Sequence, residues 1–119
     1  MAARPLDAVV DGGPDLVRVV LSGQLDRAAD AVMAGVYERA EALGAPAVEL
    51  DFGAVDYINS SGIALIVRLL ADARRDRREV RARGLTAHYL EIFRITRLAD
   101  FMTLIDETPL TTSSDGGRP

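Results

Sequence analysis

The sequence contains no cysteine and no lysine, and these two absences remove several classes of function. Without cysteine the chain has no disulfide, no thiolate nucleophile and no cysteine-ligated metal. All fourteen basic residues are arginine, so neither a phosphate-loop lysine nor a Schiff base is available. The one histidine, His88, has no second histidine or cysteine with which to share a metal, and we expect it to be an exposed surface residue. Neither a metal nor another cofactor is expected.

Long apolar runs and an excess of positive charge are also missing. No stretch approaches the about 18 consecutive apolar residues of a membrane span, and residues 1–5 lack the apolar core of a secretory signal. We therefore expect a cytoplasmic protein that makes no membrane contact. The formal net charge of −4 argues against direct nucleic-acid binding, which needs a basic surface to neutralise phosphates. A length of 119 residues suits one domain, and a monomer is the simplest oligomeric state.

Apolar periodicity and turn signals predict a hairpin followed by alternating helices and strands. The predicted strands are residues 6–11, 16–21, 47–52 and 101–105. The predicted helices are residues 27–43, 61–75 and 87–97. This order favours an α/β fold with a mixed, mostly parallel sheet of four or five strands packed against helices. The domain is predicted to span residues 6–105, after a flexible N-terminus (1–5) and before a disordered tail (106–119).

Some of these predicted elements have features that bear on function or packing. In the strand at 47–52, Glu49 and Asp51 share one face; we interpret them as marking a solvated strand end rather than a catalytic acid pair. The helix at 61–75 is apolar enough to be covered on more than one side, by its own sheet or by a partner. The arginine-rich segment 74–83 that follows is interrupted by acids, and it fits either a solvated helix end or a partner contact. The helix at 27–43 has an apolar face made of Ala29, Val32, Met33, Val36, Ala40 and Leu43.

Residues 48–63 join a strand, a short loop and the start of an apolar helix. Asn59 and Ser60 are both good N-cap residues, because their side-chain oxygens accept hydrogen bonds from the first turn of a helix. Ser61 then falls at the first or second helical position, where the partial positive charge of the helix end stabilises an anion. The two serines can serve as caps alone, or Ser61 can also accept a phosphate carrying about −1.5 to −2 charges.

Three blocks, in order and spacing, resemble the STAS domain of bacterial anti-sigma factor antagonists. Residues 48–70 are similar to the family's strand, its loop ending in Asp-Ser-Ser-Gly or Asp-Ser-Thr-Gly, and its apolar helix. Residues 21–26 are similar to its Leu-x-Gly-x-Leu-Asp turn, and residues 93–98 to its late Phe-x-(Ile/Leu)-(Thr/Ser)-Gly-Leu segment. The resemblance covers residues 6–105 and implies a single STAS domain, with one further strand at residues 80–83.

The resemblance also implies a phosphorylation-dependent partner switch. The unmodified protein would bind an anti-sigma factor that is also a serine kinase. The kinase would phosphorylate the serine directly before the glycine, here Ser61, and a metal-dependent serine phosphatase would reverse the modification. The residues expected to shape the acceptor loop or contact the partner are Asn59, Ser60, Gly62, Asp26, Asp56 and Tyr57. Asp26 can equally serve only as an N-cap for the helix that follows it.

Two positions depart from the family pattern. Asn59 stands where the family has aspartate, which keeps a capping oxygen but removes a negative charge beside the acceptor. Arg97 stands where the family often has glycine, so the residue at which the predicted helix 87–97 ends is not fixed by the resemblance. A STAS scaffold module in a larger signalling assembly, without phosphorylation, is the alternative function. A serine hydrolase is rejected, because there is no Gly-x-Ser-x-Gly elbow and the one histidine lies in a different predicted helix from the serines.

Overall fold

The computed structural model describes residues 4–105, whose five strands form one sheet in the order β1-β2-β3-β4-β5. The hairpin is antiparallel, and each later strand runs parallel to its neighbour. The strands are β1 (Asp7–Gly12), β2 (Val17–Leu25), β3 (Ala47–Ile58), β4 (Glu79–Arg83) and β5 (Thr103–Leu104). The helices are α1 (Asp30–Leu43), α2 (Ser60–Arg75) and α3 (Ala87–Ile95), with 3-10 turns η1 (Arg27–Ala29) and η2 (Leu98–Phe101). The predicted α/β fold with a mostly parallel sheet is confirmed.

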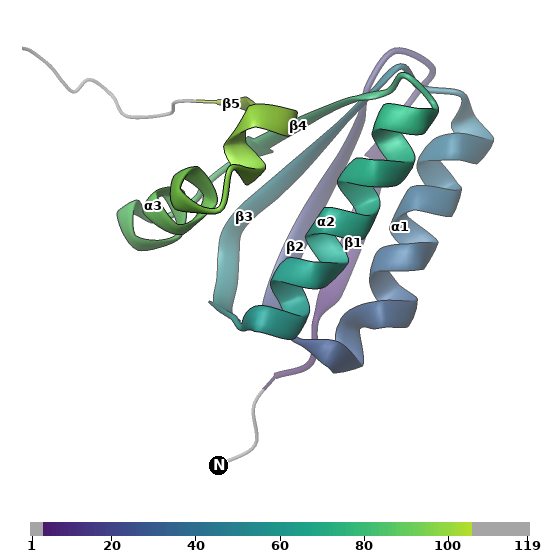
Figure 1. Ribbon diagram of the computed structural model, residues 1–119. Helices are drawn as coiled ribbons and strands as arrows, with labels where there is room; N and C mark the ends of the chain where they lie inside the picture. The colour runs from purple at the N-terminus through teal and green to yellow at the C-terminus, as the bar shows by residue number, and fades with distance from the viewer. Residues whose placement is uncertain (1–3, 106–119) are drawn as a thin grey trace, which may run out of the picture.

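One face of the sheet is apolar and carries the helices. Figure 1 shows α1 and α2 lying side by side across this face, with α3 apart from them on the other side of β3 in this view. Alternate residues of the inner strands point towards the helices and are buried, among them Val19, Leu50 and Val80. The ring of Phe93 in α3 packs edge-on against Phe52 of β3, with centroids 5.9 Å apart. The core therefore lies between the sheet and one layer of helices.

The opposite face of the sheet corrects the prediction for Glu49. This carboxylate is only 2% exposed, so it does not mark a solvated strand end. Its Oε2 atom forms ion pairs with the Nε atoms of Arg18 and Arg83, each at 2.9 Å. Because β3 is the central strand, Glu49 has a neighbouring strand on each side, and one arginine reaches it from each neighbour. Asp51 is partly buried on the same face.

Several element boundaries differ from those predicted, among them the end of β2, which continues to Leu25 instead of residue 21. β3 continues to Ile58, because its second half pairs with the end of β2 after two register shifts; the predicted loop is therefore strand. α3 ends at Ile95, before the predicted residue 97, and Arg97 has a left-handed backbone with φ of 68°. Glycine is favoured in that conformation, which accounts for the glycine in the family pattern. The predicted last strand is confined to β5, and Phe101 belongs to η2.

The apolar face of α1 also differs from the prediction in two residues. Leu43 is 44% exposed, whereas Tyr37 is only 7% exposed. The Tyr37 hydroxyl donates to Oδ2 of Asp76 at 2.6 Å and accepts from Nη1 of Arg78 at 2.8 Å. A phenol can be buried when its hydroxyl finds such partners.

The two ends of the predicted domain fall at the limits of the structure. The predicted tail 106–119 and the first three residues of the predicted flexible N-terminus lie outside the described residues. Arg4 and Pro5 lie beside β2, where the carbonyl of Arg4 accepts from the N–H of Gln24 at 3.0 Å. Within residues 4–105, no helix combines the length and the apolarity that crossing a membrane requires.

Candidate functional site

Asn59 alone separates the end of β3 from the start of α2. Its backbone is extended, and its Oδ1 atom accepts a hydrogen bond from the N–H of Gly62 at 2.9 Å. Its carbonyl accepts from the N–H of Ile63 at 2.9 Å. Asn59 is therefore the N-cap of α2, Ser60 is the first helical residue and Ser61 is the second. Of the two capping residues considered from the sequence, the structure selects Asn59.

The first turn of α2 rests on the main chain at the end of β2. The N–H of Asn59 donates to the carbonyl of Leu25 at 3.2 Å. A Cβ atom added to Gly62 would lie 2.0 Å from that same oxygen, closer than any side chain can approach. Because of this close contact, the residue after Ser61 must be glycine for the turn to form. The N–H of Ile58, just before the turn, donates to the hydroxyl of Tyr89 at 3.0 Å.

The structure brings most of the predicted site residues to this turn. Ser60 is exposed and Ser61 is partly buried, at the start of α2. Asp26 follows Leu25 directly, and its Oδ1 atom accepts from the N–H of Ala28 at 3.0 Å, which makes it the N-cap of η1. Capping is thus one role of Asp26, and contact with a partner stays a prediction.

The last residues of β3 present two more of the predicted contacts. Asp56 is exposed, and its Oδ2 atom pairs with Nη2 of Arg4 at 2.9 Å. Tyr57 is 49% exposed. Both residues precede the Asn59 turn by two or three positions. The arginine pair of Asp56 was not foreseen from the sequence, because nothing local relates Arg4 to β3.

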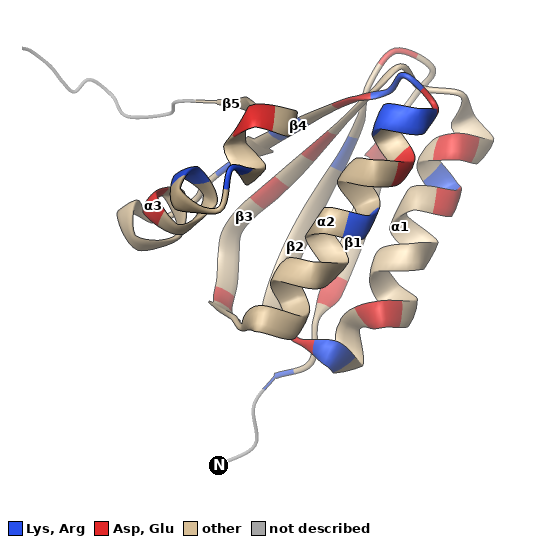
Figure 2. Cartoon of the chain, viewed as in Figure 1, with Lys and Arg blue, Asp and Glu red and all other residues tan. Residues whose placement is uncertain are grey.

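The first two turns of α2 carry no charged side chain. Residues 60–67 read Ser-Ser-Gly-Ile-Ala-Leu-Ile-Val, and Figure 2 shows this part of α2 in tan, with charged residues only in the neighbouring segments. A phosphate at Ser61 would therefore introduce about −1.5 to −2 charges on a part of α2 that itself carries none.

Residues 9–106 match the model of a protein family described as Mlab, STAS domain. The chain belongs to the STAS domain family. The match covers most of the hairpin, the Asn59 turn and every helix described above, and it confirms the family indicated by the three sequence blocks. No curated protein sequence matches the chain.

Solved structures at low sequence identity share this STAS fold. The unphosphorylated anti-sigma factor antagonist SpoIIAA matches with a TM-score of 0.67 at 14% identity, over 86% of this chain and 90% of that one. An anti-sigma factor antagonist from Mycobacterium paratuberculosis matches with a TM-score of 0.66 at 20% identity, over 84% and 85%. The Bacillus cell fate determinant SpoIIAA in its phosphorylated form gives 0.65 at 16% identity, over 85% and 93%. At these identities the likeness is one of fold.

The solvent-facing side of α2 carries a row of small and apolar residues that runs away from the serines. Ser60, Ala64, Val67 and Ala71 are all exposed, and their spacing of three or four residues aligns them along one face of the helix. Val67 is 45% exposed. The opposite side of α2 is buried against the sheet at Ile66, Leu69, Leu70 and Ala73. The sequence suggested that α2 is covered by its own sheet or by a partner. The sheet covers one side, and the face of small and apolar residues is exposed to solvent.

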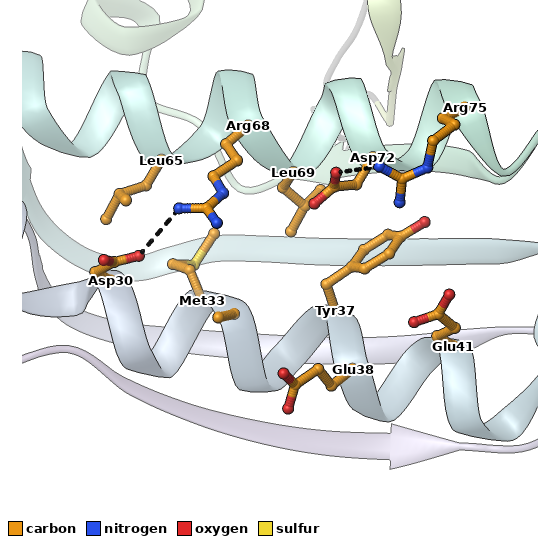
Figure 3. A pocket seen from close by; sticks show the side chains of 11 residues that line it. Asp30, Met33, Tyr37, Glu38, Glu41, Leu65, Arg68, Leu69, Asp72 and Arg75 are labelled. Carbon is orange, nitrogen blue, oxygen red and sulfur yellow. Dashed lines mark hydrogen bonds and ion pairs between the residues drawn. The ribbon is translucent and has the colours of Figure 1, made fainter.

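A groove between α1 and α2 contains charged residues that sequence analysis did not single out. Its cavity measures about 210 Å³. In Figure 3 Arg68 reaches across it towards Asp30, 3.9 Å away, while Arg75 pairs with Asp72 at 3.0 Å on the same helix. The described residues that line the cavity include no serine, threonine or histidine, so they do not form a nucleophile and base. Within residues 4–105, no cluster of acids and histidine could hold a metal ion.

Proposed function

We propose that this STAS domain is an anti-sigma factor antagonist. It binds an anti-sigma factor that is also a serine kinase, and phosphorylation of Ser61 by that kinase releases it. A metal-dependent serine phosphatase then restores the binding form. The domain itself acts by binding and performs no catalysis. The position of Ser61 carries the proposal: it is the second residue of α2, it is partly exposed, and the first two turns of the helix carry no charged side chain.

The geometry of the Asn59 turn supports a switch that leaves the fold intact. A phosphate at a helix N-terminus is favoured by the helix dipole, so we expect the modified domain to stay folded. The effect then falls on the bound complex, where a new charge would be desolvated against the partner. A loss of only ~3 kcal/mol of binding free energy lowers affinity more than a hundredfold.

Three further observations support this reading of the site. Gly62 lies against Leu25, which holds the acceptor turn in one place relative to Asp26. SpoIIAA, which shares the fold, has been described in both an unphosphorylated and a phosphorylated form. Asn59 caps α2 through its side-chain oxygen, so this departure from the family pattern keeps the turn. The missing carboxylate bears on partner recognition and on phosphoryl transfer to Ser61.

A binding and phosphorylation assay tests the proposal. Each purified anti-sigma factor kinase of the source organism is mixed with wild type, Ser61→Ala, Ser61→Asp and the control Ser60→Ala, with and without ATP. Without ATP we expect one kinase to bind wild type, Ser61→Ala and Ser60→Ala alike, whereas with ATP only Ser61→Ala should stay bound. It should phosphorylate wild type and Ser60→Ala on Ser61 and leave Ser61→Ala unmodified. Ser61→Asp should bind about a hundredfold more weakly.

The other results assign the domain differently. A kinase that binds but never modifies Ser61 would favour the STAS scaffold module, because binding would then be independent of phosphorylation. If no kinase binds wild type, the antagonist role is wrong. Phosphorylation on Ser60 in place of Ser61 would move the acceptor by one residue and contradict the site proposed above.

A further inference from the structure

An apolar hollow lies between the second half of α2 and η2, at the opposite end of α2 from Ser61. Its volume is about 200 Å³. It is lined by Val67, Leu70, Ala71, Arg74, Leu98 and Phe101. Val67 and Phe101 are 45% and 49% exposed. Large apolar side chains around an open hollow favour insertion of an apolar group from another molecule, since that removes their surface from water.

Arg74, at the edge of this hollow, differs from most arginines of the arginine-rich segment; among the described residues it shares the lack of a carboxylate partner with Arg77, which does not line the hollow. Arg75, Arg78, Arg81 and Arg83 each form an ion pair with a carboxylate. Arg74 pairs with no carboxylate among the described residues, and its guanidinium lies 5.3 Å from the centre of the Phe101 ring. The hollow is thus bordered by an exposed positive charge that the described part of the domain does not neutralise. Its electrostatic complement is a carboxylate.

The hollow continues the open face of α2 that starts at the serines. Arg74 is exposed and follows Ala71 by three residues, so it falls on the same helix face as Ser60, Ala64 and Val67. With a rise of about 1.5 Å per residue, Ser61 and Arg74 are separated by about 20 Å along the axis. The residues of this face between them, Ala64, Val67 and Ala71, are small or apolar, which allows a partner to approach that side of the helix closely. One partner can therefore contact both ends of α2.

We propose that this hollow docks a segment of the anti-sigma factor that inserts one apolar side chain between Val67 and Phe101 and places an aspartate or glutamate beside Arg74. This inference rests on the proposed function, because the occupant is the same partner. It adds a contact remote from Ser61 and names the chemistry of the segment that makes it. The arginine-rich segment thereby contains both solvated, internally paired residues and one residue that binds the partner.

Charge reversal tests the carboxylate contact, with the kinase that binds wild type in the assay above as the probe. Arg77→Glu is the matched control, because Arg77 is exposed and close to Arg74 in sequence but does not line the hollow. We expect Arg74→Glu to raise Kd about tenfold or more and Arg77→Glu to raise it less than about twofold. The difference should shrink between about 0.05 M and 0.5 M salt, because exposed charges are screened.

A second variant tests the apolar contact without changing the charge. Ala71→Gln places a longer side chain in the hollow from an exposed helical position, where glutamine is well tolerated. We expect Kd to rise about tenfold while the thermal midpoint of the free domain stays unchanged. A benzoylphenylalanine photocrosslinker at position 101 should capture a kinase peptide in which an apolar residue neighbours an acid.

The outcomes separate this inference from the proposed function. If Ser61→Asp weakens binding while Arg74→Glu and Ala71→Gln bind like wild type, the docking site is wrong and the antagonist role stands. If the hollow variants weaken binding but Ser61→Asp does not, the docking site stands and the switch at Ser61 is wrong. Loss of self-association in the hollow variants with unchanged kinase binding would make a second copy the occupant and overturn the inference. Failure of every kinase to bind wild type overturns both.

Discussion

The two ends of α2 are attached to the domain by different kinds of contact. At the N-terminal end the main chain makes the contacts, with the N–H of Asn59 on the carbonyl of Leu25 and Gly62 against the same oxygen. At the C-terminal end side chains make them. Asp76 accepts from Tyr37, and Arg78 bonds both the Tyr37 hydroxyl and, through Nε at 2.7 Å, the carbonyl of Ala45.

The difference indicates where the domain tolerates change. Main-chain contacts at van der Waals distance cannot relax around an added atom, so the turn that presents Ser61 has one geometry. A network of long side chains can lose one member and rearrange, with water replacing the missing partner. Main-chain contacts therefore suit a site whose function depends on the position of one hydroxyl, that of Ser61. The substitutions below test this contrast.

The largest effect is expected for Gly62→Ala. Its Cβ would lie 2.0 Å from the Leu25 carbonyl oxygen, so β2 and α2 must separate, and we expect the free energy of unfolding to fall by about 3 kcal/mol. Gly35→Ala in α1 is the control, because a Cβ there meets nothing within 4 Å. That change should raise stability by up to about 1 kcal/mol, since alanine favours a helix interior over glycine. Equal urea midpoints for the two variants would contradict the close contact.

A smaller effect is expected at the other end, for Tyr37→Phe. The change leaves Asp76 and Arg78 without the hydroxyl that joins them and should cost about 1.5 kcal/mol. Tyr57→Phe is the matched control, since Tyr57 is 49% exposed, and it should alter stability by less than about 0.5 kcal/mol. Urea denaturation of both variants measures the difference. A Tyr37→Phe cost as large as that of Gly62→Ala would remove the contrast between the two ends.

The two ends also differ in how far they could be predicted from the sequence. The N-terminal turn was predictable because its parts are neighbours in the chain: a strand, a capping residue, two serines and a glycine within a few positions. The C-terminal network joins Tyr37 to residues 39 and 41 positions away, and no local pattern reveals such pairs. For that reason the periodicity of α1 placed Leu43 in the core and left out Tyr37.

The sheet illustrates the same limit. Alternation correctly put Glu49 on the face away from the helices, but its burial depends on arginines from both neighbouring strands. The length of β3 likewise depends on its pairing with β2 through two register shifts. Arg97 is the opposite case. Its left-handed backbone explains why the family often has glycine at this position, which the sequence pattern alone did not explain.

A third prediction concerns the cap at the serine end. Asn59→Ala removes the oxygen that accepts from the N–H of Gly62, and we expect a loss of about 1 kcal/mol in unfolding free energy. Asn59→Asp keeps that oxygen and restores the family's residue, so its stability should equal or exceed that of wild type. Thermal denaturation of the three proteins checks this order. If the alanine variant is as stable as wild type, the cap does not hold the turn, and Gly62 packing alone must do so.

The smallest effect is a pH dependence confined to the C-terminal network. The hydrogen bond from Tyr37, followed by that from Arg75, lowers the pKa of Asp76 below its ordinary value of 3.8. A carboxyl whose pKa is lowered by folding stabilises the native state at pH values above its unfolded pKa, and this stabilisation is lost as the pH falls through the folded pKa. Tyr37→Phe removes the largest cause of the shift, so its unfolding free energy should decline less than that of wild type as the pH falls below about 4. Urea midpoints measured at neutral and acid pH test this, with Tyr57→Phe expected to follow wild type. Parallel acid profiles for wild type and Tyr37→Phe would mean that Asp76 is stabilised by its arginines alone, and the tyrosine would then secure the end of α2 through its bond to Arg78.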